Sequence, residues 1–369
     1  MLRPAVVTGV GVVSARLVGD GQALRRFLAA PPAASPRHVV DGAVLAGLID
    51  GAEARRTSRV SQLALAATRL ALADARLDDT GAAGFILGTE HGDLHSTIEF
   101  ADGYLRTGPT GLSPLLFPNT VMNTMAAATT IAVQARQLAL TLNVRTVGGE
   151  LAIARAARAV ASGRVEVALA GGVDQHDPLV AEILGELGAG SEVRGEGATL
   201  LVLESLEHAC ARGASPAGEI LGAAWRGLRT RPHGVGRRVE STAIAAALEE
   251  AGLESGAVTW VYTSASGDRA RDAWEEALLG RALDPQRLAL ASLAPLLGQH
   301  AGLGALRVAA AMWTAASGLL VQPAWGGGAA DDRTTALVPV APGPGLVHGV
   351  ARGGTHVALV VGGPPGDVQ

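Results

Sequence analysis

Apolar residues occur along this chain in short runs and in longer stretches with helical spacing. Residues 5–13 are rich in valine and almost free of polar side chains, which predicts a buried strand. Over residues 55–77, apolar positions recur every three or four residues behind a hydroxyl at Thr57 or Ser58, which predicts an amphipathic helix with an N-cap. Such alternation of strands and helices is typical of an α/β protein. Further elements are expected at 85–88 (strand), 217–225 (strand) and 240–252 (helix).

The stretch 141–174 is the most informative part of the chain. It begins within LTLNVRT, which predicts a buried strand, and continues through the tight turn VGGE into the alanine-rich pattern of a helix, LAIARAARAVASG. A second strand, VEVALAGG, ends in glycines. A strand that turns sharply into a helix is how α/β enzymes present a nucleophile, because the helix N-terminus supplies free N–H groups and partial positive charge.

This stretch resembles the nucleophile elbow of the β-ketoacyl-acyl-carrier-protein synthases of the thiolase fold. The pattern A-A-R-x-V-x-x-G at 156–163 and the strand end A-G-G at 170–172 follow the order found in that family. Counting back from these glycines, the position of the family's cysteine is occupied by Thr146. The resemblance therefore implies an elbow that has lost its thiol.

The resemblance covers nearly the whole chain and implies its architecture. The opening GVGVVS, the GEGA at 195–198 and the GGT at 353–355 all have counterparts in the family. We expect a thiolase fold with two duplicated α-β-α-β-α layered halves, each with a mixed five-stranded sheet. The first half would span residues 1–215 and carry the degenerate elbow, and the second would span 216–369 and carry degenerate histidine motifs.

Those histidine motifs can be aligned from residues that remain. An Asp and a Glu that follow the family's first catalytic histidine survive as Asp272 and Glu275, which places that histidine at Ser264. The glycines of the second motif place its histidine at Gln299 and its lysine at Ala294. Four positions, including the elbow, thus carry residues other than those of the family.

The four replacements bear directly on chemistry. Decarboxylative condensation needs a soft nucleophile, imidazoles that assist decarboxylation and donors for the oxyanion. The Thr146 hydroxyl has a far higher pKa than a thiol, and Ser264 and Gln299 do not transfer protons near pH 7. The resemblance then implies a non-catalytic chain-length factor (KSβ) of a type II polyketide synthase, which pairs with an active ketosynthase and helps shape the acyl tunnel. The segment FPNTVMN resembles such partners from polyene and aryl polyene pathways.

Two other hypotheses remain open. The pocket could serve an acyltransferase, hydrolase or cyclase in which Thr146 is the nucleophile and His300 the base. This requires His300 within hydrogen-bond reach of Thr146, whereas the matched glycines place Gln299 in that slot. The third hypothesis is a homodimeric protein that binds acyl-carrier proteins, which differs from the first only in its mate.

Three further segments are assigned through the resemblance. The family's interface segment corresponds to 113–134, where Phe117, Met122, Asn123 and Met125 are candidates for an interface or an acyl tunnel, with ordinary core residues as the alternative. The gate that carries a phenylalanine in the family is replaced by a segment with Val350 and Arg352. An arginine-rich loop offers contacts for the phosphate or acidic surface of an acyl-carrier protein, with a merely solvated loop as the alternative. Its candidates are Arg229, Arg231, Arg237 and Arg238.

Composition narrows the class of protein further. With 369 residues, 48% of them hydrophobic, the chain can bury a large core. A net charge of −4 with mixed signs gives no footprint for nucleic acid, and no apolar run is long enough for a membrane span. The single Cys210 excludes an internal disulfide and is expected to be buried on a helix, which fits a cytoplasmic protein. The two histidines of HGDLH lack a third ligand, so we expect no metal site, and the sequence contains no cofactor motif.

Overall fold

The computed structural model describes the whole chain except residues 1–2, 36–37, 326–333 and 367–369. The strands are β1 (Ala5–Ser14), β2 (Val18–Asp20), β3 (Ala83–Thr89), β4 (Ala139–Asn143), β5 (Val167–Asp174), β6 (Gly197–Ser205), β7 (Gly218–Gly227), β8 (Trp260–Tyr262), β9 (Ala289–Ala291), β10 (Leu319–Pro323), β11 (Thr335–Pro339), β12 (Gly345–Val350) and β13 (Thr355–Gly362). The α-helices are α1 (Gly21–Ala29), α2 (Gly42–Ala46), α3 (Gly51–Ala54), α4 (Arg59–Ala75), α5 (Leu94–Thr107), α6 (Thr124–Val133), α7 (Gly148–Ala161), α8 (Pro178–Leu184), α9 (Leu206–Ala211), α10 (Thr242–Glu250), α11 (Arg269–Ala282), α12 (Ala294–Leu297) and α13 (Ala301–Ser317). Single turns are η1 (Pro109–Gly111), η2 (Phe117–Thr120), η3 (Gly185–Ala189) and η4 (Ser255–Ala257).

The strand order reveals an internal duplication. The first half has the order β4-β3-β5-β6-β1, and the second half, from its own outer edge, has β9-β8-β12-β13-β7. Once β2 and the β10–β11 hairpin are set aside, each order is third, second, fourth, fifth and first strand of its half. The predicted mixed five-stranded sheets of a thiolase fold are therefore confirmed. The two sheets are also continuous, because β1 pairs with β7 where Ala5 lies opposite Ile220.

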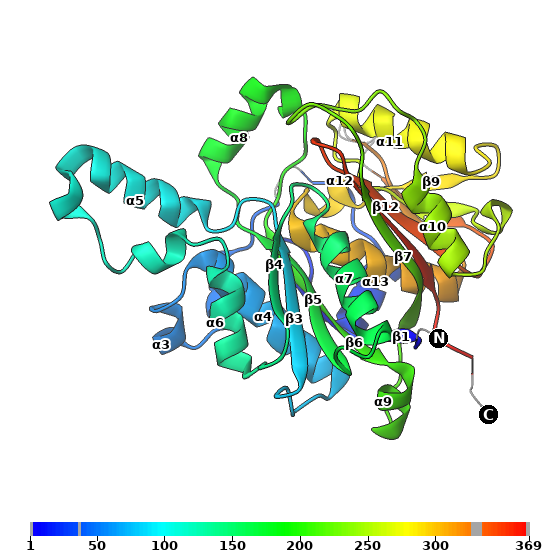
Figure 1. The fold of residues 1–369 in the computed structure, drawn as a ribbon, viewed down its shortest axis with the longest axis horizontal. Coiled ribbons are helices and arrows are strands. Elements are labelled where there is room, and N and C mark those ends of the chain that lie inside the picture. The colour runs from blue at the N-terminus through cyan, green and yellow to red at the C-terminus, as the bar shows by residue number, and fades with distance from the viewer. Residues whose placement is uncertain (1–2, 36–37, 326–333, 367–369) are drawn as a thin grey trace.

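Helices cover both halves in layers (Figure 1). Helices α7 and α13 pack against each other and against strands of both halves, so they form the central layer. One core cluster joins this layer to the sheet, a second lies between α4 and the first half, and a third lies between α10 and the second half. Helix α4 begins after Ser58, as the sequence predicted, and ends where Arg76 adopts a left-handed conformation.

Two local predictions were wrong. The run LTLNVRT was expected to form a buried strand, but β4 lies at the outer edge of the sheet and its residues are exposed or half-buried. The strand pairs on one side only, with β3. Cys210, expected to be buried, is exposed, because the short helix α9 buries only Ala209. Among the described residues, no helix combines the length and apolar character that a membrane span requires.

Candidate functional site

The predicted elbow is present as a sharp turn from β4 into α7. Thr146 has a φ of +70°, a left-handed conformation that a branched side chain adopts only under strain. The helix then begins with two glycines, and a Cβ at Gly149 would lie 2.1 Å from the carbonyl oxygen of Ala301. The backbone of α13 therefore lies directly against the elbow and leaves no room for a side chain there.

The structure brings Gln299 against the elbow. Its Nε2 lies 3.1 Å from the carbonyl oxygen of Thr146 and 2.9 Å from Oε1 of Glu90. Ser264 lies farther along the same polar region, where its Oγ donates to Oε2 of Glu275 at 2.7 Å. Ala294 is enclosed within α12. All four positions that the sequence aligned with the family's cysteine, histidines and lysine are at most 1% exposed.

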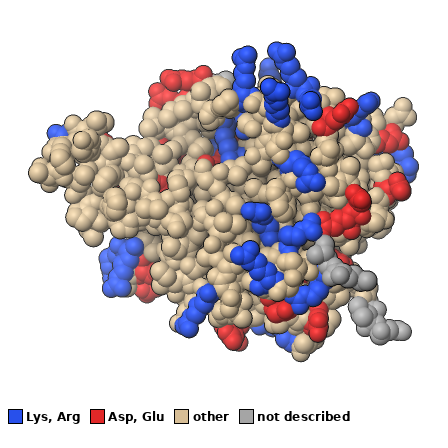
Figure 2. All heavy atoms as spheres, viewed as in Figure 1, with Lys and Arg blue, Asp and Glu red and all other residues tan. Residues whose placement is uncertain are grey.

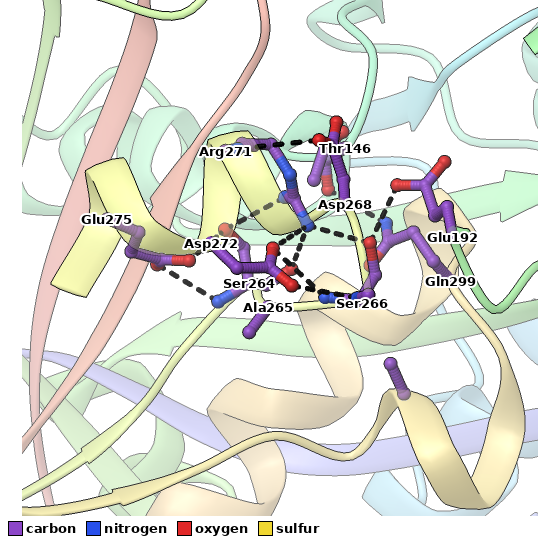
Figure 3. A network of polar contacts seen from close by, with 12 residues as sticks. Thr146, Glu192, Ser264, Ala265, Ser266, Asp268, Arg271, Asp272, Glu275 and Gln299 are labelled. Carbon is purple, nitrogen blue, oxygen red and sulfur yellow. Dashed lines mark hydrogen bonds and ion pairs between the residues drawn. The ribbon is translucent and has the colours of Figure 1, made fainter. Parts of the chain in front are cut away.

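Buried polar contacts join three of these positions, Thr146, Ser264 and Gln299, and Figure 3 shows the part that runs from Glu192 through Ser266 and Arg271 to Ser264. Arg194 Nη1 lies 2.6 Å from Glu90 Oε2 and 3.1 Å from Glu192 Oε2. Glu192 also accepts from Arg145 at 3.1 Å and from Ser266 at 2.7 Å. Arg271 completes the chain, since it donates to both Ser266 and Ser264, so we call the whole set the elbow network. Its members are Glu90, Arg145, Glu192, Arg194, Ser264, Ser266, Arg271 and Gln299.

The sequence did not reveal these charged residues as parts of the site. Glu192 and Arg194 belong to the connection between β5 and β6, which the family resemblance identifies as shorter than the family's usual connection. Arg194 contacts Glu90, which follows β3 and lies 104 positions away in the sequence. The shortened connection therefore supplies side chains that fill the interior beside the elbow.

The charged side chains beside the elbow shift one another's pKa values. Burial acts to raise the pKa of Glu90, but Arg194, His91 and the hydrogen bond from Gln299 outweigh it and hold that pKa below its usual range. Burial, followed by the nearby Glu90 charge, raises the pKa of Asp174 to about 7. Asp174 accepts hydrogen bonds from Thr89 Oγ1 at 2.8 Å and from the backbone N–H of Ala301 at 2.7 Å.

His300 does not act on the elbow. Neither ring nitrogen of His300 has a hydrogen-bond partner among the described residues, so the pair with Thr146 that the second hypothesis requires is not formed. The ring lies instead beside Gly197, where a Cβ would be 3.0 Å from its Cε1. Burial lowers the pKa of His300 to about 3. The geometry thus contradicts a Thr146–His300 dyad.

The gate segment is held by an ion pair. Arg352 pairs with Asp268 through two contacts, one of them 2.7 Å between Nη2 and Oδ1, and it also donates to the carbonyl oxygen of His233 at 3.0 Å. Val350 is buried against Trp274. The four arginines proposed for carrier contact are exposed on the loop that contains His233. They are Arg229, Arg231, Arg237 and Arg238.

The predicted interface residues divide into two groups. Phe117 and Met122 are 60% and 41% exposed, and Asn123 is exposed at the start of α6. Met125 is completely buried in the core cluster beneath α6, as in the core alternative that the sequence left open. A tan area with few charges covers the α5 end of the molecule in Figure 2. We call the exposed apolar residues of α5, of α6 and of the segment between them the α5–α6 surface: Tyr104, Leu105, Leu115, Phe117, Val121, Met122 and Ile131.

A cavity of about 730 Å³ lies near the elbow network but does not include its degenerate positions. It is lined by Thr263 and Ala265, the neighbours of Ser264, and by Ser292 of the following block. Thr146, Ser264 and Gln299 are not among its lining residues. Within the described part of the chain, no group of three or more histidine, cysteine or acidic residues could hold a metal ion.

The layered fold with a strand-to-helix elbow defines a thiolase-like protein, and comparisons with known proteins identify its family. The family model described as "Beta-ketoacyl synthase, N-terminal domain" matches residues 45–209. The "Putative polyketide beta-ketoacyl synthase 1" of Streptomyces halstedii is 30% identical over 358 residues, which cover 84% of this chain and 85% of that protein. The chain therefore belongs to the β-ketoacyl synthase family.

Solved structures agree on the fold. The ishigamide ketosynthase/chain length factor has a TM-score of 0.85 at 22% identity and covers 99% of this chain and 100% of its own. A type II polyketide acyl-carrier protein in complex with its ketosynthase has a TM-score of 0.81 at 20% identity, with 98% and 100% covered. The resemblance to ketosynthases and the thiolase fold inferred from the sequence are thus confirmed.

Proposed function

We propose that this chain is a chain-length-factor-type subunit that pairs with an active β-ketoacyl-acyl-carrier-protein synthase in the cytoplasm. In this role it performs no condensation itself and helps to shape the partner's acyl tunnel. The observation that carries the proposal is the contrast between a closed interior at the elbow and an exposed apolar surface on α5 and α6.

The α5–α6 surface supports the heterodimer. Monomeric proteins rarely expose a contiguous group of large apolar side chains, and Leu105, Leu115 and Ile131 are all more than three-quarters exposed. Strand β4 lies at the sheet edge, so one side of its backbone has unpaired N–H and C=O groups. A similarly folded partner with its own edge strand would satisfy both surfaces together.

The elbow network supports the absence of condensation. The nucleophile position carries a threonine, and both histidine positions carry residues that do not exchange protons near pH 7. Buried ion pairs occupy the space beside Gln299, where a substrate thioester and malonyl group would need room. An intact acyl tunnel would then be contributed by the partner, with this chain forming one wall.

The arginine loop supports contact with an acyl-carrier protein. Arg229, Arg231, Arg237 and Arg238 present four exposed cations, and the loop is tied to the gate by the bond from Arg352 to His233. One structural neighbour is described as a ketosynthase in complex with its acyl-carrier protein. Exposed guanidinium groups are well suited to carboxylate and phosphate partners.

Co-expression with the cysteine-bearing ketosynthase encoded nearest to this chain tests the proposal. We expect a one-to-one complex, purified through a tag on this chain, that condenses acyl-carrier substrates at an unchanged rate when Thr146 is replaced by Ala. If the chain purifies without that mate and turns over an acyl thioester, and Thr146→Ala abolishes the turnover, the partner function is wrong.

A matched pair of variants locates the interface. Met122→Asp places a charge on the α5–α6 surface, whereas Val44→Asp places one on α2 at nearly the same exposure, 42% against 41%. We expect Met122→Asp to weaken the complex by about tenfold or more, because a desolvated unpaired charge costs at least about 1.4 kcal/mol. Val44→Asp should leave the affinity unchanged. Equal affinity for both variants would place the interface elsewhere.

Charge reversal tests the carrier contact separately. The double variant Arg237→Glu/Arg238→Glu should lower the affinity of the complex for its acyl-carrier protein by about tenfold at low salt, with a smaller effect at high salt. Arg25→Glu on the exposed side of α1 is the control and should change little. An equal loss of binding in both variants would mean that net charge, and not contact with this loop, determines the affinity for the acyl-carrier protein.

A further inference from the structure

The cavity of about 730 Å³ near the elbow network takes no part in the proposed subunit function. It is lined by residues of α11 and β9, at the end of the molecule away from α5 (Figure 1). Its volume is typical of sites for small organic molecules, which measure about 300–1,000 Å³. Its lining shares no residue with the α5–α6 surface or with the arginine loop. A ligand in this cavity would therefore leave both proposed contact surfaces free.

Two neighbouring parallel strands end at this cavity. Strands β8 and β9 pair in parallel, with Tyr262 opposite Ala291. The residue that follows each strand, Thr263 after β8 and Ser292 after β9, lines the cavity. In open α/β sheets, ligands bind outside the carboxyl ends of the strands. The topology of the second half thus places this cavity where a ligand site is expected.

The hydroxyl groups of the lining have already donated their protons within the chain. Ser191 Oγ donates to the carbonyl oxygen of Gly267 at 2.5 Å. Thr263 Oγ1 and Ser292 Oγ likewise donate to backbone carbonyl oxygens. A hydroxyl group has one proton to donate and two acceptor lone pairs. These three oxygens can therefore only accept hydrogen bonds from a ligand.

One face of α11 adds carboxylates to the lining. Residues 269, 272, 273 and 276 recur at helical spacing, and all four line the cavity. The side chain of Asp272 is 20% exposed and accepts from the backbone N–H of Gly267 at 2.8 Å and from Arg271 at 2.8 Å (Figure 3). Burial nevertheless raises the pKa of Asp272 to about 6, because it outweighs the nearby charge of Arg271. At neutral pH, Asp272 is therefore an ionised carboxylate that a further cation would stabilise.

The rest of the lining favours a cation with an apolar body. Leu290 supplies an apolar wall, and the indole of Trp325 is 46% exposed at the cavity. An indole face attracts a cation that lies within about 6 Å of the ring centre. Arg269 is the one arginine or lysine of the lining and is exposed, as is Glu276, which has no cationic partner among the described residues. Because the carboxylates of the lining outnumber this arginine, an anionic ligand would meet net repulsion.

We propose that this cavity binds an organic amine in its cationic form. The ammonium group donates to Asp272 and to the hydroxyl oxygens of the lining. The carbon body of the amine lies against Leu290 and Trp325. A protonated amine has hydrogen-bond donors and no acceptor, which matches hydroxyl and carboxylate groups that only accept. The proposal is independent of the subunit function, because none of these residues takes part in it.

Calorimetric titration with three probes of similar size tests the proposal. We expect 4-phenylbutylamine, a cation at about pH 7.5, to bind with a dissociation constant of about 1 mM or tighter. The anion 4-phenylbutyrate should bind at least about tenfold more weakly, and the neutral 4-phenylbutanol should lie between the two. The protein is the full chain, in complex with its ketosynthase where the two associate.

Variants assign the binding to this cavity. Asp272→Asn retains an acceptor for the backbone N–H of Gly267 but removes the charge, so it should weaken amine binding by about tenfold. Ala273→Trp fills the cavity from an exposed position on α11 and should weaken the binding of amine and alcohol by at least about tenfold. Glu249→Gln, on the exposed side of α10 and outside the cavity, is the control and should leave the affinity unchanged.

Two results would overturn the proposal. One is amine binding no tighter than that of 4-phenylbutyrate in wild type, which includes the absence of binding by both probes. The other is wild-type amine affinity in Ala273→Trp, with its folding verified by circular dichroism. Neither result affects the subunit function, which is read from complex formation with the ketosynthase and from the Thr146→Ala variant.

Discussion

The interior at the elbow and the α5–α6 surface differ in how far their chemical groups are satisfied within the chain. At the elbow, Glu90 and Glu192 are completely buried, yet both are paired with Arg194. On the surface, side chains such as Leu105 and Leu115 are more than four-fifths exposed. The difference teaches that polar groups beside the elbow are satisfied within the chain, whereas the apolar side chains of the α5–α6 surface are not, and the proposed subunit function rests on this contrast.

The largest expected effect comes from opening the elbow network. Arg194→Met removes the arginine that pairs with buried Glu90 and one of the two arginines that pair with Glu192, and should lower the free energy of unfolding by about 3–5 kcal/mol. Denaturant titration of the isolated chain measures this loss. Arg69→Met is the control, because its pair with Glu53 is 43% and 23% exposed and should contribute no more than about 1 kcal/mol. Equal losses in the two variants would contradict a closed, interdependent interior.

The next effect concerns access to the elbow. A thiol introduced by Thr146→Cys should react with iodoacetamide at least about a hundredfold more slowly than Cys210, because a 1% exposed position reacts only after local opening. Cys210 is exposed in the same molecule and serves as an internal reference. Comparable rates would mean that a channel reaches the elbow from solvent.

The free energy of unfolding should depend on pH through Asp174, which lies in the interior beside the elbow. Because the pKa of Asp174 is raised to about 7, the folded chain holds a proton there that the unfolded chain releases near pH 4. This group therefore stabilises the fold at low pH, and its contribution is lost as the pH rises from about 4 to 7. The free energy of unfolding should fall more steeply over this range in wild type than in Asp174→Asn. The exposed Asp102→Asn should follow the wild-type slope, and a parallel slope for Asp174→Asn would refute the assignment.

The smallest effect is expected at the surface of the isolated chain. Phe117 is 60% exposed, so Phe117→Ala should change the free energy of unfolding by no more than about 0.5 kcal/mol. The same variant should still weaken the ketosynthase complex measurably by titration calorimetry. A large loss of stability in the isolated chain would show that Phe117 supports the fold and not the interface.

Local patterns predicted the parts of this molecule that depend on local geometry. Through the family resemblance, the glycines around the elbow and the second histidine motif also aligned Thr146 and Gln299 with positions of one site, and the structure has a 3.1 Å contact between Gln299 Nε2 and the Thr146 carbonyl oxygen. The apolar alternation also gave most strands and helices. The division of the chain at residues 215 and 216 stays a prediction.

The failures share a physical cause, which is that long-range neighbours leave no local signal. The segment TMAAATTIAV, which contains Met125, is apolar on all sides. Its pattern therefore gives no sign that Met125 is buried, whereas Met122, just before the segment, is exposed. The pairing of Arg352 with Asp268 joins residues 84 positions apart, and neither residue predicts the other.

The edge position of β4 also has a consequence for the chain before it meets any partner. A newly made copy exposes an unpaired strand and a band of large apolar side chains at the same time, and such edges nucleate aggregation. Under the proposed function, the yield of native protein therefore depends on whether the partner ketosynthase is synthesised at the same time and place. Expression alone should give a lower yield of folded, monodisperse chain than joint expression with the partner ketosynthase.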